Sequence, residues 1–316
     1  MSYKNIFGPV HSRRLGISLG VDVIPYKYCP LNCVYCEVLR TNHLTIHRQE
    51  FFPPEEILSK VREVLATNPE LDYVTFSGAG EPTLYSKLGE VILSIKKEFP
   101  QYKLAILTNG ALLNHPSVRK EILPLDLILP SLDTCNPETF KKINRPHPSI
   151  KVSDLISGLI ALRKEYSGPI WLEIFIIAGL NDSEEELESL SKAINRIQPD
   201  KVQLNSLDRP GAEFWVKPAG TRVLREVQRF LSERVDVPVE IIARIPSDKD
   251  ELMIPPEIEG IIAKIINDHP STVEEIAKAS ELHINEVSHY LRQLHLEHKI
   301  NIKPSEKGPL FVWKKS

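Results

Sequence analysis

The sequence lacks long hydrophobic runs and a strong excess of either charge. No segment reaches the roughly 18 consecutive apolar residues that a membrane-spanning helix needs. The 39 basic and 42 acidic residues leave a net charge of −3, so the whole chain has no electrostatic attraction to nucleic acid or anionic lipid. Residues 1–9 lack the basic and then apolar pattern of a signal peptide. These absences predict a cytoplasmic protein that makes no membrane contact.

Cysteine is also scarce, but its distribution is uneven. The chain has four cysteines, too few for a disulfide-stapled scaffold, and cytoplasmic thiols stay reduced. Cys29, Cys33 and Cys36 lie within eight residues of one another, whereas Cys135 stands alone. A cluster of thiols in a reducing compartment indicates a metal site rather than disulfides.

Short apolar segments alternate with helical patterns over the first 245 residues. Near-continuous apolar runs of this length are typical of parallel strands buried on both faces. The runs cover residues 17–24, 73–76, 104–107, 127–129, 171–177 and 202–204, with 238–245 as a candidate further strand. About six β/α units in succession predict an α/β fold, either a full or partial β/α barrel. An open doubly wound sheet is the alternative.

The pattern changes after residue 245. Residues 246–256 are polar and bounded by prolines, which predicts a linker between domains 1–245 and 257–316. Three helical patterns follow, over 258–266, 273–279 and 284–298, and then two short strands, 299–303 and 310–313, flank a turn. Three short helices followed by a hairpin are typical of a winged helix-turn-helix domain.

The clustered cysteines have the spacing Cys29-x3-Cys33-x2-Cys36, directly after the first predicted strand. Thiolates suit iron–sulfur clusters and zinc. Three thiolates can bind three irons of a four-iron cluster, which normally has four cysteine ligands, and leave one iron open to a small molecule. The alternative is a structural zinc site completed by His43 or His47. The spacing favours iron–sulfur, because structural zinc commonly uses two C-x2-C pairs and the chain has no second pair.

This spacing, with Tyr35 just before the last cysteine, resembles the signature of the radical S-adenosylmethionine (SAM) superfamily. The resemblance implies a partial (β/α)6 barrel with one 4Fe-4S cluster on Cys29, Cys33 and Cys36. The open iron would bind the amino and carboxylate groups of SAM, with Tyr35 against SAM. An electron from a donor such as flavodoxin or ferredoxin would cleave SAM to methionine and a 5′-deoxyadenosyl radical, which removes hydrogen from a substrate.

The loop after the second predicted strand agrees with this resemblance. Residues 77–83 (SGAGEPT) resemble the GGEP motif of the superfamily, with Ala79 in place of the second glycine. The resemblance implies that Gly78, Gly80 and Glu81 bind the amino group of SAM. A tight turn with an exposed glutamate is the alternative.

Four further strand ends carry candidate SAM-binding residues, at the end of a β/α barrel that holds its chemistry. Asn109 lies in a Thr-Asn-Gly tripeptide after the third strand. Ser131 and Asp133, after the fourth strand, point the same way by alternation, and the resemblance implies that they bind SAM. Ile177 lies in a segment similar to the one under the adenine in the superfamily, and Asn205 follows the sixth strand. An ordinary Asn-Gly turn and a helix cap are the alternatives for Asn109 and Asp133.

Few residues are candidates for substrate contact. Arg145 resembles an arginine that some superfamily members direct at the SAM carboxylate. Cys135 lies two residues beyond Asp133, where its thiol could donate a hydrogen atom, although an inert buried cysteine is the common case. Arg13 and Arg14 could bind a carboxylate or phosphate at the barrel mouth, or form a solvated basic pair.

The ends of the chain bear on subgroup and partner. Residues 8–16 (GPVHSRRLG) resemble the N-terminal segment of radical enzymes of the wybutosine and molybdenum-cofactor type. No cysteine follows Cys135, so this chain cannot build the second all-cysteine cluster of the molybdenum-cofactor cyclase. Basic residues concentrate after residue 288, so the predicted winged helix could contact an RNA or a protein or peptide substrate. The competing hypotheses are an iron–sulfur redox sensor that binds nucleic acid, and a zinc-stabilised structural protein.

Overall fold

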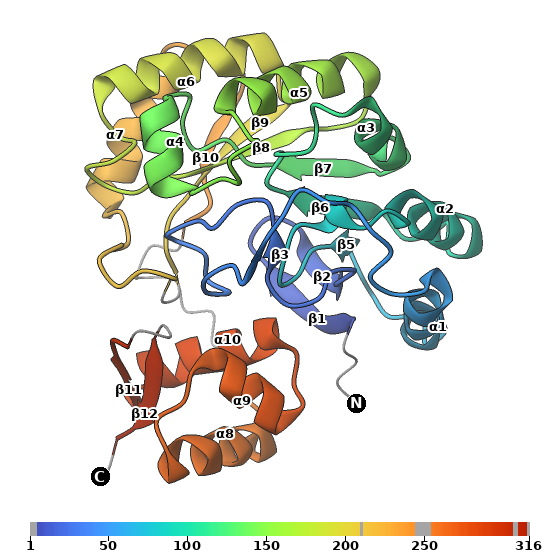
Figure 1. Cartoon of the computed structure of the whole chain (residues 1–316), viewed down its shortest axis with the longest axis vertical. Coiled ribbons are helices and arrows are strands. Elements are labelled where there is room, and N and C mark those ends of the chain that lie inside the picture. The colour runs from blue at the N-terminus through green and yellow to red at the C-terminus, as the bar shows by residue number, and fades with distance from the viewer. Residues whose placement is uncertain (1–4, 209–210, 244–253, 306–308, 315–316) are drawn as a thin grey trace.

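The structure is a computed structural model that describes residues 5–208, 211–243, 254–305 and 309–314. Its larger part is an α/β unit (Figure 1). The strands are β1 (Ile6–Ser12), β2 (Gly16–Val21), β3 (Tyr28–Cys29), β4 (His43–Leu44), β5 (Tyr73–Phe76), β6 (Leu104–Thr108), β7 (Leu127–Pro130), β8 (Trp171–Phe175), β9 (Lys201–Asn205) and β10 (Val239–Ile241). The helices are α1 (Pro54–Leu65), the 3-10 helix η1 (Pro82–Leu84), α2 (Leu88–Glu98), α3 (Pro116–Ile122), α4 (Pro137–Ile143), α5 (Val152–Glu165), α6 (Glu184–Ile197) and α7 (Thr221–Ser232).

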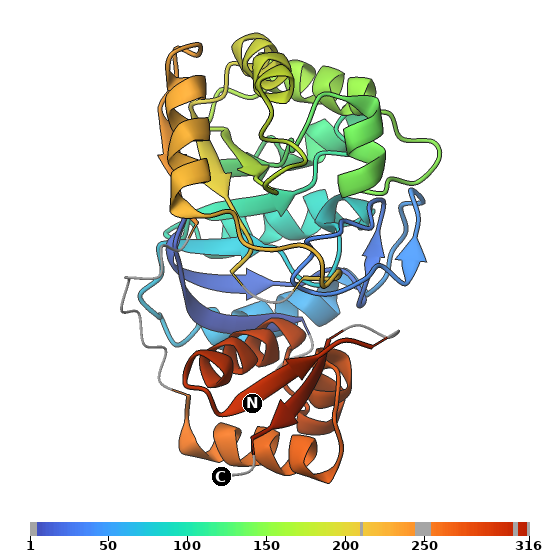
Figure 2. The same cartoon turned by 90° about the vertical axis from the view of Figure 1, so that its left-hand side faces the viewer.

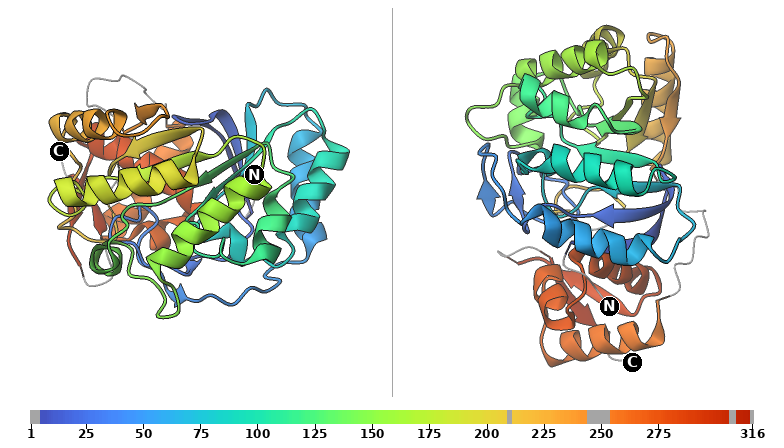
Figure 3. Two further views of the ribbon diagram at one scale, coloured as in Figure 1. Left: turned by 90° about the horizontal axis from the view of Figure 1, so that it is seen from above. Right: turned by 90° about the vertical axis from the view of Figure 1, so that its right-hand side faces the viewer.

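The main strands form one curved sheet. Five follow the order β1-β2-β5-β6-β7 and three the order β10-β9-β8. Two single parallel bridges, Ile128 with Ile170 and Ser131 with Glu173, connect β7 to β8. All neighbours in this sheet are parallel except β1 with β2. Helices α1, α2, α3, α5 and α6 follow one another around one side of the sheet (Figure 3). This arrangement agrees with the predicted partial β/α barrel and not with the doubly wound alternative, whose helices cover both faces.

Each predicted strand is present, with ends that differ by a few residues, but β1 is a strand that the sequence analysis does not predict. Pro9 lies inside β1 and cannot donate a ladder hydrogen bond, so it hides the strand in the sequence. The structure accommodates it because β1 is the edge of the sheet, antiparallel to β2, and its register with β2 shifts between Phe7 and Val10. The candidate strand at 238–245 is the shorter β10.

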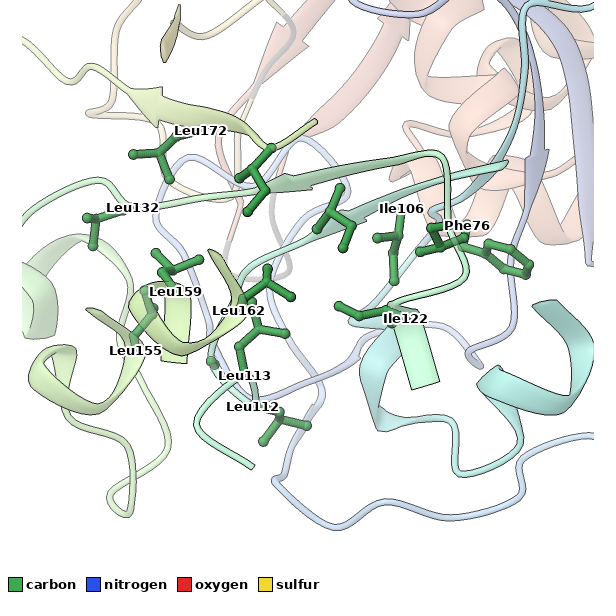
Figure 4. Close-up of a cluster of buried hydrophobic side chains, with 14 of the residues drawn as sticks. Phe76, Ile106, Leu112, Leu113, Ile122, Leu132, Leu155, Leu159, Leu162 and Leu172 are labelled. Carbon is green, nitrogen blue, oxygen red and sulfur yellow. The ribbon is translucent and has the colours of Figure 1, made fainter. Parts of the chain in front are cut away.

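Apolar side chains of the strands pack against the inner faces of the helices. Figure 4 shows Phe76 and Ile106, from β5 and β6, beside Ile122 of α3, with Leu159 and Leu162 of α5 in the same group. All five side chains are fully buried, and burial of each contributes about 1.5–3 kcal/mol relative to an exposed position. This core fixes the strands, so that their carboxyl ends and the loops that follow meet at one edge.

The C-terminal residues form three helices and a hairpin. The elements are α8 (Pro256–Asp268), α9 (Val273–Ser280), α10 (Ile284–Leu296), β11 (Ile300–Lys303) and β12 (Leu310–Trp313). A capping box between Thr272 and Glu275 begins α9, and β11 pairs antiparallel with β12. This order is the one that the sequence predicts. Residues 244–245 of the candidate strand 238–245, residues 246–253 of the predicted linker and residues 306–308 of the predicted turn lie outside the described residues.

None of the helices in the described part of the chain has the length and apolar character that crossing a bilayer requires.

Candidate functional site

Residues 22–39, which we call the cysteine loop, follow β2 and carry the three clustered cysteines at the carboxyl edge of the sheet. Their side chains are half-buried and form no disulfide. Backbone hydrogen bonds hold this loop in place: Val34 N–H donates to the Ile143 carbonyl at 2.9 Å, and Cys36 N–H donates to the Cys33 carbonyl at 3.2 Å. The cysteine loop is therefore anchored to the end of α4 as well as to its own turn.

Each thiol accepts a hydrogen bond from a different polar side chain. The pairs are Asn109 Nδ2 with Cys29 Sγ at 3.4 Å, Asn144 Nδ2 with Cys33 Sγ at 3.5 Å and Lys27 Nζ with Cys36 Sγ at 3.1 Å. Burial raises the pKa of Cys29 to about 12 and raises that of Cys33 as well. Deprotonation at these positions thus needs a compensating positive charge, which a bound metal supplies. The donor set fits a soft metal centre with negatively charged sulfurs.

The zinc alternative has no geometric support. Among the described residues, no group of three His, Cys, Asp or Glu side chains is arranged to bind a single metal ion. His43 and His47 are exposed, and the His43 ring stacks on Tyr28 with 4.1 Å between ring centroids. In an iron–sulfur cluster the thiolates bind different irons and need not converge on one point. The three thiols are therefore compatible with a cluster in which each binds a different iron.

Glu81 points inward and is 2% exposed, which excludes the exposed-glutamate alternative, while its contact with SAM stays a prediction. Its side chain accepts hydrogen bonds from the hydroxyls of Thr83 and Thr108, both at 2.6 Å, and from Asn109 N–H at 2.8 Å. It also accepts one from the Thr83 N–H at 3.1 Å. Burial raises the pKa of Glu81. Glu81 thus connects the loop after β5 to the end of β6 and the loop that follows it.

The glycines on either side of Ala79 allow close contact with the cysteine loop. A Cβ atom on Gly78 would lie 2.0 Å from Asp22 Cγ, and one on Gly80 would lie 2.3 Å from the Tyr28 carbonyl oxygen. Both glycines therefore pack directly against other residues of the protein. Their predicted backbone contact with SAM stays a prediction.

Asp133 likewise accepts hydrogen bonds from three protein donors. Its carboxylate accepts hydrogen bonds from Tyr35 Oη at 2.5 Å, Asn144 Nδ2 at 2.7 Å and Phe175 N–H at 2.9 Å. Burial raises the pKa of Asp133 and of Tyr35. The Tyr35 ring stacks on Phe175 with 3.9 Å between centroids. Asp133 therefore fastens the cysteine loop to the ends of β7 and β8, and its predicted contact with SAM stays a prediction.

A narrow cavity of about 10 Å³, enough for about one water molecule, nevertheless brings several predicted residues together. Its lining comes from the cysteine loop, from the ends of β6 and β7, from α4 and the residue after it, and from α5. The lining residues are Leu31, Tyr35, Asn109, Ser131, Leu132, Asp133, Phe140, Asn144 and Leu155. Asn144 Oδ1 is buried and has no hydrogen-bond partner among the described residues. Its Nδ2 faces Asp133, which fixes the orientation of the amide. Asn144 thus offers an acceptor for a ligand amino or hydroxyl group, a role that the sequence analysis did not assign.

Ile177, Asn205 and Arg145 lie around the same edge in other settings. Ile177 is buried in an apolar group with Val34 and Phe175. Asn205 is buried, and its Oδ1 accepts a hydrogen bond from Ser206 N–H at 2.9 Å. Arg145 adopts a φ of 43° and forms an ion pair with Glu213 at 2.5 Å, so its guanidinium is already partnered. None of these contacts is with the narrow cavity.

Cys135 does not line the narrow cavity. It lines a separate outer cavity of about 910 Å³, together with Arg145, Lys151 and Arg196, and Phe140 lines both cavities. Burial raises the pKa of Cys135 to about 12. The expected role as a hydrogen-atom donor has no support in this geometry, because β7 ends before Cys135 and the chain turns toward α4.

The two arginines before β2 are engaged within the protein, which does not support the expected anion site. Arg13 donates to the Ile242 carbonyl at 3.0 Å and lies 3.9 Å from Asp208. Arg14 forms an ion pair with Glu173. The predicted loop residues Arg209 and Pro210 lie outside the described residues.

Comparison with known sequences gives relatives over most of the chain. A UPF0026 protein of Methanocaldococcus jannaschii is 33% identical over 273 residues, which are 85% of this chain and 84% of that protein. A protein named GTPase Obg, from Brachyspira hyodysenteriae, is 35% identical over 291 residues, 92% of this chain but only 42% of its own length. A GTP 3′,8-cyclase of Streptomyces coelicolor is 27% identical over 49% of this chain and 44% of its own.

Solved structures show the same fold at low identity. A radical SAM methyltransferase from Sphaerobacter thermophilus gives a TM-score of 0.55 with 19% identity, over 72% of this chain and 66% of that one. Streptococcus suis SuiB bound to S-adenosylmethionine gives a TM-score of 0.53 with 14% identity, over 72% of this chain and 50% of that one.

More than half of the chain matches one protein family. Residues 23–191, which include the cysteine loop and the strand ends up to β8, match the Radical SAM superfamily. Members of this superfamily are enzymes that bind SAM and a 4Fe-4S cluster. The chain belongs to the radical SAM superfamily.

Proposed function

We propose that this protein binds one 4Fe-4S cluster through Cys29, Cys33 and Cys36, and SAM at the iron that lacks a cysteine. The observation that carries the proposal is the set of three free thiols on one anchored loop, each with its own hydrogen-bond donor. When bound and reduced, the cluster would supply the electron that cleaves SAM to methionine and a 5′-deoxyadenosyl radical, which would remove hydrogen from a substrate.

The chain's own residues position and tune this site. Lys27, Asn109 and Asn144 donate to the three sulfurs, and hydrogen bonds to cluster sulfurs shift the reduction potential. The free Asn144 Oδ1 is the acceptor that we assign to a donor group of SAM. Tyr35 is held by Asp133 and Phe175, so that its ring forms a fixed wall of the narrow cavity.

The substrate that we propose is a macromolecule, RNA or a protein or peptide, and the electron donor is a small redox protein such as flavodoxin or ferredoxin. Similarity to a GTP 3′,8-cyclase supports a relation to that enzyme, and the relation to wybutosine-type enzymes rests on the resemblance of residues 8–16. The order of three helices and a hairpin supports a winged helix, and we propose that the enzyme acts in the cytoplasm. A redox-sensing regulator is less well supported, because the matched superfamily consists of enzymes.

The test is anaerobic reconstitution with iron and sulfide, followed by dithionite and SAM, with 5′-deoxyadenosine measured by chromatography. Wild type should bind about four irons per chain and form 5′-deoxyadenosine. The Cys29→Ala/Cys33→Ala/Cys36→Ala variant should do neither, whereas the Cys135→Ala control should do both. Zinc in place of iron in the wild type, with no 5′-deoxyadenosine, would contradict the proposal.

A further inference from the structure

Helix α10 is the third helix of the C-terminal domain, the one that a winged helix-turn-helix places in a nucleic-acid groove. Here it lies against the barrel. Figures 1 and 2 both show α10 as the part of the domain nearest to β1. Val287 and Leu291 of α10 belong to the buried apolar group of the C-terminal domain, which extends to Leu39 of the cysteine loop and Ala79. On α10, Ser288 contacts Glu37 and Arg292 contacts Asp208, so the face that carries these two side chains is directed at the barrel.

The residue before α10 makes the deepest polar contact of this interface. His283 Nδ1 accepts a hydrogen bond from Asn285 N–H at 3.2 Å and so caps the helix. Because Nδ1 is an acceptor, the ring proton lies on Nε2, which is 3.2 Å from Asp22 Oδ2. Both side chains are 5% exposed, and the His283 ring stacks on Phe7 of β1 with 4.5 Å between centroids. A buried hydrogen bond to a carboxylate is among the stronger kinds.

Asp22 connects this contact to both loops of the site. Its Oδ2 also accepts from Ala79 N–H at 2.8 Å, and its Oδ1 accepts from Ile24 N–H at 3.1 Å. Lys27 N–H donates to the Ala79 carbonyl at 3.1 Å. Ala79 stands where the GGEP motif has its second glycine, and its methyl group is 4% exposed within the apolar group shared with α10. The departure from the motif therefore occurs where the C-terminal domain covers the loop.

Two further contacts reach the residue after the last cysteine. Ser288 Oγ donates to the Glu37 carbonyl at 3.4 Å. Arg292 Nε lies 3.0 Å from Asp208 Oδ1, and Asp208 N–H donates to Glu37 Oε1 at 2.9 Å. Helix α10 therefore contacts the cysteine loop on both sides of the three cysteines, at Asp22 before them and at Glu37 after them.

We propose that α10 is a clamp on the cysteine loop, with His283 and Ser288 as positioning residues that fix the loop relative to residues 78–81. The C-terminal domain then completes the cluster and SAM site from outside and does not use α10 to bind nucleic acid. The role in SAM binding rests on the proposed function, whereas the clamp itself is a property of the apo protein.

Hydrogen exchange on the apo protein tests the clamp without the cluster. His283→Asn keeps a good helix cap but is too short to reach Asp22. Exchange in residues 22–39 and 77–83 should become about tenfold faster, as expected for the loss of one buried hydrogen bond to a carboxylate. His283→Gln, whose Nε2 can donate to Asp22, should restore part of the protection. His298→Asn, at an exposed position of left-handed backbone, is the matched control and should exchange like wild type.

Exchange within α10 itself shows whether the C-terminal domain stays folded. If His283→Asn also loses protection within α10, Ser288→Ala becomes the deciding variant. This substitution favours helix, and it should speed exchange only near residues 36–39. Unchanged exchange in the two loops of both variants would overturn the clamp. In the reconstituted enzyme, His283→Asn should raise the KM for SAM several-fold more than it lowers kcat. Absence of 5′-deoxyadenosine in wild type would refute the proposed function and leave the exchange result standing.

Discussion

At the scale of single residues, the sequence predicts where polar side chains gather but not what they contact. The strand ends carry Glu81, Asn109, Ser131 and Asp133 as expected, and three of these four line the narrow cavity. Glu81 and Asp133 instead use their oxygens on neighbouring loops. Strand alternation predicts the direction of a side chain. It does not predict the hydrogen-bond donors that contact this side chain, because they come from segments distant in sequence. Asn144, which contacts both Asp133 and Cys33, could not be found from a motif for the same reason.

Asp133→Asn should destabilise the protein by about 2 kcal/mol, because an amide cannot accept from all three donors that now meet the carboxylate. Urea unfolding followed by circular dichroism measures the change. Asp236→Asn, at an exposed position, is the control and should stay within about 0.5 kcal/mol of wild type. Equal stability of the two variants would mean that the Asp133 contacts contribute nothing.

The raised pKa of Glu81 has a consequence for the pH dependence of stability. Burial raises the pKa of Glu81 above its ordinary value of 4.5, so the native state binds more protons than the unfolded state in the window above that value. Stability therefore falls as pH rises through this window. Glu81→Gln removes this contribution, so its stability should fall less than that of wild type as pH rises above 4.5. Parallel urea-unfolding profiles of the two proteins across this range would contradict the prediction.

At the scale of elements, the parallel strands could be predicted because their apolar runs are buried on both faces. β1 could not, because its interior proline is tolerated only at an edge, and edge position is a property of the whole sheet. The loop after β5 shows the same limit. Its glycines suggest contact with a ligand, but in the structure they lie against Asp22 and Tyr28 of the cysteine loop.

Gly80→Ala should destabilise the protein by about 1–3 kcal/mol, because the new Cβ atom would meet the rigid Tyr28 carbonyl and force the two loops apart. Iron content after reconstitution should fall with it. Gly260→Ala is the matched control: nothing lies within 4 Å of its Cβ position in α8, so it should stabilise the helix by about 1 kcal/mol. Thermal unfolding and iron analysis of both variants test these opposite signs.

At the scale of the whole molecule, the sequence predicts the order of the C-terminal elements but not their position against the barrel. An amphipathic helix has the same pattern whether it faces its own domain or another one, and the residues that meet at this interface, such as Asp22 and His283, are 261 positions apart. The domain boundary in the sequence therefore does not mark the limit of the contacts around the cysteine loop, which the barrel and the C-terminal domain both contact.

The ion pair between Arg292 and Asp208 connects the C-terminal domain to the barrel, and its strength can be measured. Both side chains are largely buried, at 12% and 13% exposure, so solvent screens their attraction less than at the surface. A double-mutant cycle of Arg292→Ala and Asp208→Ala should give a coupling of about 1–3 kcal/mol in urea unfolding. The exposed pair Lys141–Glu138, at 67% and 81% exposure, is the control and should give about 0.5 kcal/mol or less. Equal coupling in the two cycles would mean that the C-terminal domain is only loosely apposed to the barrel, because a transient contact cannot keep two charges desolvated and paired.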